Sequence, residues 1–399
     1  MTGAAIVNQV ETIDLVDHAE WCRWWSVEEA VPPFAWVRIN GSFTLFREQS
    51  IWRNGTNVCH VRDLTVGDVI YDDADHAVTI STIEEIEDDS LIWYRFAISG
   101  DHSYIVDGVT VHNASRFWVG GTGTWDSSTT THWGSSSGTS DNSSVPGSAD
   151  TVVFDGSSGG GTCTVNFGGT ITITSLTFGA FTGTLDFSVN NNGITLSSGS
   201  GAFNGNGSGA RILKMGGGTW SFTSTLSSGN ALWNLFTATN MTLVAGGSTI
   251  AYTGNVTTGS GARLFTSAGA TYNNISFLGN GSYAFSGSAN LTIGTLTLGP
   301  NANVRFLNGQ TYTCTSLAST ATSSAPASMM TDVDTERSTI SIASGTQSIA
   351  NVAIKDMAFT GGATFAATGY NLGNNSGITI TAPSGGGGGG SPRFSATIF

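Results

Sequence analysis

The 399-residue sequence predicts an all-β protein, with an N-terminal β domain followed by a β-solenoid, a stack of coils built from short strands. Short runs of alternating apolar residues, closed by Gly, Asn or Ser, recur along most of the chain. The net charge of −14 is uneven: residues 1–113 hold 19 of the 28 acidic and 6 of the 14 basic residues, so −13, and the remainder carries −1. Glycine shows the opposite bias, with 6 residues before position 114 and 48 after it. This break in composition predicts two independently folding regions.

The chain divides into five parts on these grounds. They are an N-terminal segment (1–34), a β domain (35–115), a Trp-rich segment (116–149), a β-solenoid (150–381), and a Gly-rich linker with a C-terminal tail (382–399). The borders follow changes in charge, glycine content and strand pattern.

The acidic β domain begins with FAWVRIN, residues 34–40, whose alternation predicts a strand that ends in a turn at Gly41. Further strands are expected in Ser42–Gly55, which ends in an Asn-Gly turn, in Val61–Asp73, and in the runs at 77–88 and 91–99. Helix signals are weak throughout the chain, and the best candidate is Val16–Glu29. An all-β domain of short strands is therefore expected.

The end of this domain carries the most specific motif of the chain, DHSYIVDGVTVHNAS from Asp101 to Ser115. It resembles the C-terminal end of an intein or Hint domain, with a His before an aromatic residue, an apolar strand, a Gly turn, and His-Asn at the cleavage point. The matching residues are His102, Tyr104, Ile105, Gly108, Val111, His112 and Asn113. The D-L-x-x-G-D pattern of Asp63, Leu64, Gly67 and Asp68 also resembles this family.

The resemblance implies a horseshoe-like, all-β Hint fold over about residues 35–114, and it implies a self-cleavage chemistry. In that chemistry the side-chain amide of Asn113 attacks its own backbone carbonyl, forms a succinimide and cuts the chain after itself. His102 and His112 are the residues that would move the protons, as general acid and base.

Departures from the family pattern argue against splicing. Gln49 stands where the family places a His, and glutamine cannot shuttle protons near neutral pH as imidazole does. Ala114 stands where a Cys, Ser or Thr must accept the acyl chain, and Cys22 lies in a poor context for a first Hint residue. We therefore expect no ligation and, at most, autocatalytic cleavage after Asn113. The alternative is an inactive Hint fold that serves as a spacer or docking module.

The Trp-rich segment opens with RFWVGGTGTWDSSTTTHW, Arg116 to Trp133, which resembles the start of β-rich phage and surface repeat proteins. Two interpretations of Trp118, Trp125 and Trp133 stay open. They could seal the first coil of the repeat array, because terminal repeats need a cap. They could instead lie exposed and contact a glycan by stacking on sugar rings.

A strand repeat follows from Asp150. TITITSLTFG (Thr170–Gly179) and NLTIGTLTLG (Asn290–Gly299) share one pattern, and ATYNNISFLG (Ala270–Gly279) is a weaker copy. Their equivalent residues Phe178, Phe277 and Leu298 lie 99 and 21 residues apart, which indicates coils of about 20 residues. Each strand offers only two or three apolar side chains, so only stacked coils can bury them in one core.

The last coils, Thr339–Ile380, resemble the V-S-x-x-x-I-x-D, T-G-G-A-T-F and G-N-N-x-G ending of phage tail and bacterial surface solenoids. SGGGGGGS (Ser384–Ser391) reads as a flexible linker. In the tail PRFSATIF, residues Phe394, Ile398 and Phe399 could dock on a partner, and a disordered end is the alternative.

Several classes of function are disfavoured. Cys22, Cys59, Cys163 and Cys314 show no metal-binding spacing and read as buried free thiols, so neither a metal nor a cofactor is expected. The acidic first region would repel nucleic acid, and the remainder has no basic patch to attract it. No apolar run is long enough to span a membrane, and the N-terminus lacks the pattern of a secretory signal. We therefore expect synthesis in the host cytoplasm.

Together these features lead to the hypothesis of a bacteriophage virion structural protein, in a tail spike, tail fibre or tail tip, that contributes to host attachment. Other virion proteins and host surface polysaccharide are the expected partners, and association into a homotrimer would cover weakly charged strand edges. Three alternatives stay open: a head fibre or decoration protein, a polysaccharide-degrading spike, and a bacterial surface adhesin. A degrading spike needs two carboxylates, and Asp332 and Asp334, which are close in sequence, lie in an expected loop.

Overall fold

The computed structural model describes the chain from residue 115 to 383 with short gaps, and shorter stretches before it. The gaps are 141, 149, 226–228, 230, 237–238, 257–260 and 288–289; the earlier stretches are 5–7, 27–30, 35–46, 50–53, 57–61, 64–71, 77–87, 93–96, 103–106 and 109–112. The described residues form an all-β fold without an α-helix, as the sequence predicts. Gly156–Ser158 forms a single 3-10 turn.

The N-terminal strands form small, mostly antiparallel sheets with their own hydrophobic core. A five-stranded sheet has the order β1 (Ala5–Val7), β11 (Ser103–Val106), β12 (Val109–His112), β5 (Ser50–Arg53), β6 (Asn57–His60). The others are β4 (Phe43–Phe46), β3 (Ala35–Ile39), β9 (Ile83–Glu87); β10 (Trp93–Phe96) with β2 (Val27–Ala30); and β7 (Val69–Tyr71) with β8 (Ala77–Thr79). The helix expected at Val16–Glu29 is wrong at its end, because Val27–Ala30 pairs with β10 as a strand; residues 16–26 lie outside the described part.

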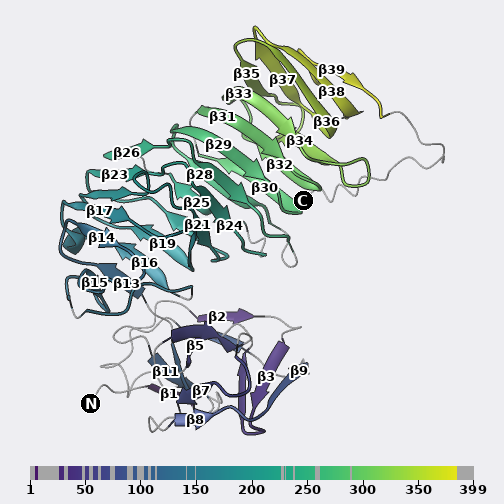
Figure 1. Cartoon of the computed structure of the whole chain (residues 1–399). Coiled ribbons are helices and arrows are strands. Elements are labelled where there is room, and N and C mark those ends of the chain that lie inside the picture. The colour runs from purple at the N-terminus through teal and green to yellow at the C-terminus, as the bar shows by residue number, and fades with distance from the viewer. Residues whose placement is uncertain are drawn as a thin grey trace.

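The solenoid consists of three sheets of mainly parallel strands, one along each side of the stack (Figure 1). The 13-stranded sheet has the order β15 (Trp133–Gly134), β13 (Ser115–Trp118), β16 (Thr151–Phe154), β19 (Ser175–Phe178), β22 (Phe203–Asn204), β25 (Ala231–Leu235), β28 (Arg263–Ser267), β30 (Gly281–Ser286), β32 (Ala302–Phe306), β34 (Ala327–Thr331), β36 (Thr346–Lys355), β38 (Thr364–Asn371), β39 (Thr379–Thr381). The five-stranded sheet of the solenoid comprises β14 (Gly123–Trp125), β17 (Thr162–Val165), β20 (Thr184–Asp186), β23 (Arg211–Lys214), β26 (Met241–Val244).

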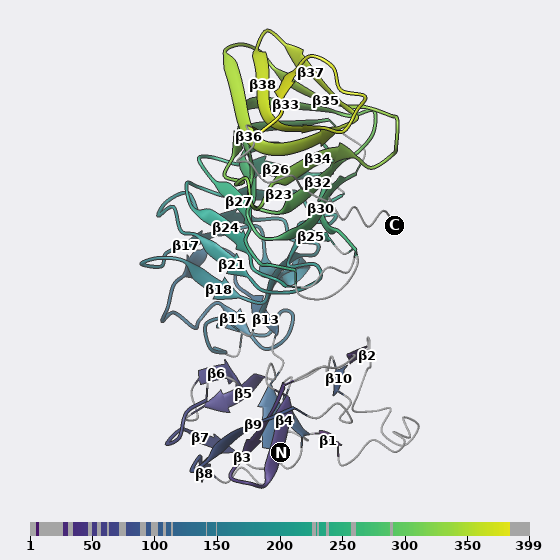
Figure 2. The same cartoon turned by 90° about the vertical axis from the view of Figure 1, so that its right-hand side faces the viewer.

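The nine-stranded sheet comprises β18 (Ile171–Ile173), β21 (Ile194–Leu196), β24 (Thr219–Phe222), β27 (Thr249–Tyr252), β29 (Thr271–Phe277), β31 (Leu291–Leu298), β33 (Thr311–Ser319), β35 (Ser338–Ile342), β37 (Met357–Gly361). Figure 2 shows its first strands, from β18 to β27, as successive steps of one side of the stack.

The cross-section of the solenoid changes along its length. In the first coils the chain visits all three sheets in turn, for example β16, β17 and β18. The five-stranded sheet ends at β26, and from β28 onward the chain passes directly between the other two sheets (Figure 1). The strands of the nine-stranded sheet lengthen at this step, because β29, β31 and β33 have 7, 8 and 9 residues, whereas β18 has 3.

Coil length varies along the solenoid, and coils close to the predicted length occur in both parts, as where Cys163 pairs with Leu185 and where Phe277 pairs with Leu298. On the 13-stranded sheet the coils become longer toward the end of the three-sided part, where Leu176 pairs with Phe203 and Phe203 pairs with Trp233. After the five-stranded sheet ends, Phe265 pairs with Phe285 and Phe277 with Leu298, which is the predicted coil length. Omitting one strand and its turn shortens the coil at this step, and later coils lengthen again where Val304 pairs with Met329 and Tyr312 with Ile340.

The predicted equivalence of Phe178 with Phe277 and Leu298 is also wrong. Phe178 lies on β19 of the 13-stranded sheet, where it pairs with Phe154, whereas Phe277 and Leu298 pair in the nine-stranded sheet. The cause is local. The segment Thr170–Gly179 bends and forms two strands, β18 and β19, which belong to different sheets, whereas Asn290–Gly299 contains the single strand β31.

Aromatic side chains stack along the axis inside the solenoid. Ring centroids of successive pairs on the 13-stranded sheet lie 4.3 to 5.9 Å apart, through Phe154, Phe178, Phe203, Trp233, Phe265, Phe285 and Phe306. Such pairs contribute about 0.5–1.5 kcal/mol each beyond the burial of their area. This single core, separate from that of the N-terminal strands, holds consecutive coils together.

Cys163 and Cys314 are buried free thiols, as the sequence predicts. Burial raises the pKa of Cys163 well above its ordinary value and that of Cys314 to about 12. Both thiols therefore stay protonated and unreactive near neutral pH. Cys22 and the side chain of Cys59 lie outside the described residues.

The G-N-N-x-G motif near the C-terminus covers the last strand of the nine-stranded sheet. The Phe359 amide donates to the Ser376 carbonyl at 2.9 Å, and the Met357 amide donates to Asn375 Oδ1 at 3.0 Å. At Gly377, which has a φ of 75°, a Cβ would lie 1.9 Å from the Phe359 carbonyl oxygen. The motif thus provides hydrogen-bond partners for backbone groups of β37, which a further coil would otherwise provide.

Among the described residues, no helix has the length and apolar character needed to cross a membrane.

Candidate functional site

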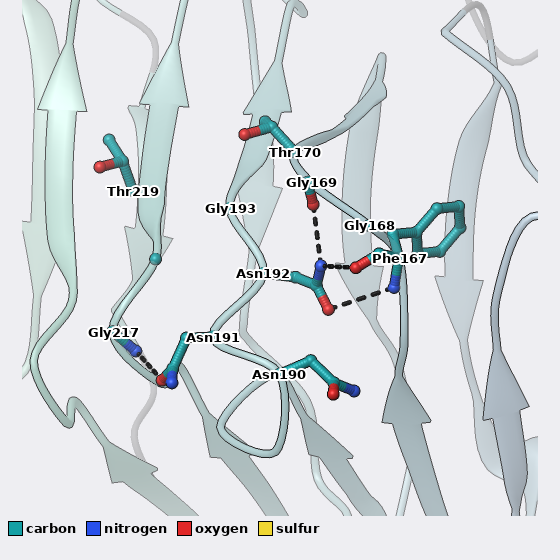
Figure 3. A pocket seen from close by; sticks show the side chains of 11 residues that line it. Phe167, Gly168, Gly169, Thr170, Asn190, Asn191, Asn192, Gly193, Gly217 and Thr219 are labelled. Carbon is teal, nitrogen blue, oxygen red and sulfur yellow. Dashed lines mark hydrogen bonds between the residues drawn. The ribbon is translucent and has the colours of Figure 1, made fainter.

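A polar groove of about 480 Å³ lies where three successive coils turn into the nine-stranded sheet (Figure 3). Its walls come from residues 167–170 before β18, residues 190–193 before β21, and residues 217–219 at the start of β24. Because neighbouring strands lie about 4.8 Å apart, these three corners extend for about 10 Å along the axis. We call this feature the corner groove.

Three consecutive asparagines build the middle corner. The buried Asn192 donates through Nδ2 to the carbonyls of Phe167 and Gly169, at 2.6 and 2.8 Å, and accepts from the Phe167 amide at 3.3 Å (Figure 3). Asn191 has a left-handed φ of 52° and accepts from the Gly217 amide at 2.6 Å. Side-chain amides thus replace strand pairing where the backbone turns.

Glycines keep the groove open. At Gly193 a Cβ would lie 2.9 Å from both Thr170 Oγ1 and the Thr219 carbonyl oxygen, so only glycine fits between these two coils. At Gly168 and Gly169 a Cβ would meet nothing within 4 Å, because both residues face the open space of the groove. The groove is therefore narrow at its floor and accessible at its rim.

The rim is polar and neutral. Thr170, Asn190, Asn191 and Thr219 are exposed, and Asn190 uses its Nδ2 to donate to the Val165 carbonyl at 3.0 Å. The ring of half-buried Phe167 points away from the asparagines (Figure 3) and packs edge-on against Trp125, with centroids 6.1 Å apart. None of the described residues that line the groove carries a charge. The arrangement can form hydrogen bonds with a neutral, hydroxyl-rich ligand, but its described lining residues include no titratable acid or base.

The three tryptophans considered for glycan contact lie in the core. Trp118, Trp125 and Trp133 are each 0% exposed, and Trp133 packs edge-on against the other two at 5.1 and 5.3 Å. The glycan-contact interpretation is therefore corrected, because none of the three has a free ring face for a sugar. His132 stacks on Trp118 at 4.7 Å, and β15 pairs antiparallel with β13, so this segment closes the first coil.

Asp332 and Asp334 lie in a loop, as expected, and each has a partner. The Asn308 amide donates to Asp332 Oδ1 at 2.7 Å, and Lys355 donates to Asp334 Oδ1. The hydrogen bond from Lys355 lowers the pKa of Asp334. A general acid in sugar hydrolysis needs a raised pKa, so this environment is the opposite of the one required. The described residues contain no cluster of His, Cys, Asp and Glu suited to a metal ion.

The motif around Asn113 is described only in part. Strands β11 and β12 form an antiparallel hairpin in which Ser103 pairs with His112. His102, Gln49, Asn113, Ala114 and the side chain of His112 lie outside the described residues, so the expectation of no ligation and at most a cut after Asn113 stays a prediction. In the D-L-x-x-G-D pattern, Asp63 also lies outside the described residues. Leu64 is buried, and Gly67 has a φ of 102°. Asp68 Oδ2 accepts a hydrogen bond from the Thr65 amide at 2.8 Å.

Sequence reasoning missed the corner groove. The signal available was the run Asn190–Gly193, three amides and a glycine between two short strands, opposite the Phe167–Gly169 turn one coil earlier. Only the coil register brings these two runs together, and the repeat pattern predicts one uniform coil length instead.

Comparisons of this chain with protein-family models, with curated proteins and with solved structures find no match.

Proposed function

We propose that this chain is a bacteriophage virion structural protein, in a tail spike, tail fibre or tail tip, that contributes to host attachment. The observation that carries the proposal is the parallel stack of coils with one continuous core, because such solenoids form stiff, extended binding surfaces. The resemblance of the N-terminal domain to Hint domains and of the last coils to phage tail solenoids supports it further.

In this proposal the protein is made in the host cytoplasm and assembles with other virion proteins. Several copies, most simply three, associate around one axis, with the acidic N-terminal domain toward the particle and the solenoid pointing outward. The support for self-association is the shortage of charge on the solenoid, which carries few of the charged groups that usually protect exposed strands.

The corner groove is the proposed contact for host surface polysaccharide. Its exposed Asn and Thr side chains suit a neutral glycan, which offers many hydroxyls. Its length of about 10 Å matches a short oligosaccharide segment.

The location in the particle is tested with purified particles of the phage that encodes this chain. Antibodies against residues 115–383, detected by gold labelling, are expected at the tail of intact particles. Label on the head would move the protein to the head-fibre alternative. Label on uninfected cells, with none on particles, would refute a virion protein and favour an adhesin.

The glycan contact is tested by filling the groove. Gly169→Phe places a ring in open space without backbone strain and is expected to weaken binding of the purified protein to host polysaccharide by tenfold or more. Gly247→Phe is the matched control: Gly247 lies at the same corner of the next coil, where its Cβ would be 3.7 Å from the Gly217 Cα, and outside the groove lining. Equal binding by both variants and wild type would overturn the assignment of the groove. Release of shortened sugars by the wild type would favour the degrading spike.

A further inference from the structure

The described strands of the nine-stranded sheet contain no charged residue. Their sequences, from β18 to β37, are ITI, ITL, TWSF, TIAY, TYNNISF, LTIGTLTL, TYTCTSLAS, STISI and MAFTG. The other two sheets do carry outward charges, such as the Asp186–Lys214 ion pair of 2.8 Å on the five-stranded sheet and Arg305 on the 13-stranded sheet. The outer face of the nine-stranded sheet is thus set apart by its chemistry.

The outward side chains of this face form straight ladders of hydroxyl groups. Parallel pairing aligns Thr271 with Thr292, Thr292 with Thr313, Thr313 with Ser341, and Ser341 with Thr360. In a second ladder the hydroxyls of Thr295 and Ser316 bond to each other at 2.9 Å. Short, β-branched or small side chains in register make the face flat, with methyl and hydroxyl groups exposed in rows.

The absence of charge extends beyond the strands. Between Asp186 and Asp332 the sequence has no acidic residue and only four basic ones, of which Arg211 and Arg263 are 1% exposed. Soluble surfaces ordinarily mix both signs of charge, and depletion of charge is what distinguishes the centre of a protein interface. Leu278, directly after β29, is 39% exposed at the border of this face.

The area of the face suits an interface. Nine strands about 4.8 Å apart span roughly 40 Å, and strands of 3 to 9 residues are about 18 Å long on average. The face therefore measures roughly 700 Å², close to the ~800 Å² that each partner buries in a stable complex. Sheets with small outward side chains can stack at about 10 Å.

We propose that copies of this chain pack on one another through the outer face of the nine-stranded sheet. The occupant of the face is the same face of the neighbouring copies, turned toward the shared axis, because neutral faces with the same coil spacing meet without burying an unpaired charge. This inference rests on the self-association included in the proposed function, and it assigns the surface responsible.

The test places a charge on the face. Thr292 is exposed in the single chain, so Thr292→Lys leaves the fold intact but would bury an ammonium group between packed copies. Thr242→Lys is the matched control, since Thr242 is an equally exposed strand threonine on the five-stranded sheet. Molar mass is measured by light scattering and sedimentation across micromolar concentrations, and circular dichroism monitors the fold.

We expect the wild type and the control variant to be assembled. The Thr292→Lys variant is expected to dissociate at protein concentrations at least tenfold higher than those at which the wild type dissociates. An assembled wild type with an unaffected Thr292→Lys variant would overturn the assignment of this face and leave self-association standing. A wild type that stays monomeric would refute both self-association and the assignment of this face. The location in the virion is decided separately by the gold labelling.

Discussion

At the scale of single residues, asparagines and glycines at the coil corners do the work that strand pairing does elsewhere. Asn192 satisfies three backbone groups of the preceding coil, and Gly193 permits an approach that a Cβ would block. A run that reads only as a turn in the sequence therefore determines how two coils fit together, and it also lines the corner groove.

Asn192→Ala is expected to destabilise the solenoid by about 2 kcal/mol, because it leaves buried backbone groups of Phe167 and Gly169 without partners. Urea denaturation of the variant and wild type measures the difference. Asn190→Ala is the control: its side chain is exposed and makes one hydrogen bond of 3.0 Å, so a loss of about 0.5 kcal/mol is expected. Equal losses in the two variants would contradict the role assigned to Asn192.

The chain is expected to stay mostly uncut at Asn113, because Gln49 and Ala114 depart from the Hint pattern at a proton-transfer and an acceptor position. Intact-mass measurement of the native protein checks this. A dominant fragment that begins at Ala114 would show active cleavage chemistry, and Asn113→Ala would then abolish that fragment.

At the scale of elements, the solenoid changes its cross-section where the five-stranded sheet ends at β26. The chain keeps the same core while it omits one strand per coil, because longer strands on the nine-stranded sheet supply the apolar side chains that the missing strand would have given. At the first coil, the buried Trp118, Trp125 and Trp133 close the core with large apolar volume.

The Asp186–Lys214 pair links β20 to β23 and makes stability depend on pH. Burial raises the pKa of Asp186, but hydrogen bonds from Lys214 and Ser188 outweigh it, and the net pKa is lowered. A lowered pKa in the folded state means that this contribution is present above the ordinary Asp value of about 3.9 and is lost as pH falls through the folded value.

Stability of the wild type is therefore expected to fall more steeply on acidification below about pH 4 than that of Asp186→Asn, which lacks the titrating group. Urea midpoints recorded between about pH 6 and about pH 3 measure the two slopes. If the urea midpoints of the two proteins fall in parallel with pH, the lowered pKa assigned to Asp186 in the folded state is contradicted.

At the scale of the whole molecule, the described residues form two hydrophobic cores that share no residue, one in the N-terminal strands and one along the solenoid. The acidic charge lies with the first and the glycine with the second. A solenoid whose coils depend mainly on their neighbours needs little from a distant domain.

A truncated chain that begins at Ala114 is therefore expected to remain folded and rich in β-structure. Circular dichroism and a cooperative unfolding transition check this, with the full-length chain as the reference. If the truncated chain is unfolded while the full-length chain is folded, the two regions depend on each other for stability.

The sequence by itself determined the all-β class, many of the strands, and the burial of Cys163 and Cys314, because alternation and turn residues act locally. Only the tertiary structure decided the coil register, the burial of Trp118, Trp125 and Trp133, and the corner groove. The physical reason is that alternation identifies which side chains point inward but not which sheet a strand joins. That choice depends on the length of each coil, which is greater where Phe203 pairs with Trp233 than where Phe265 pairs with Phe285.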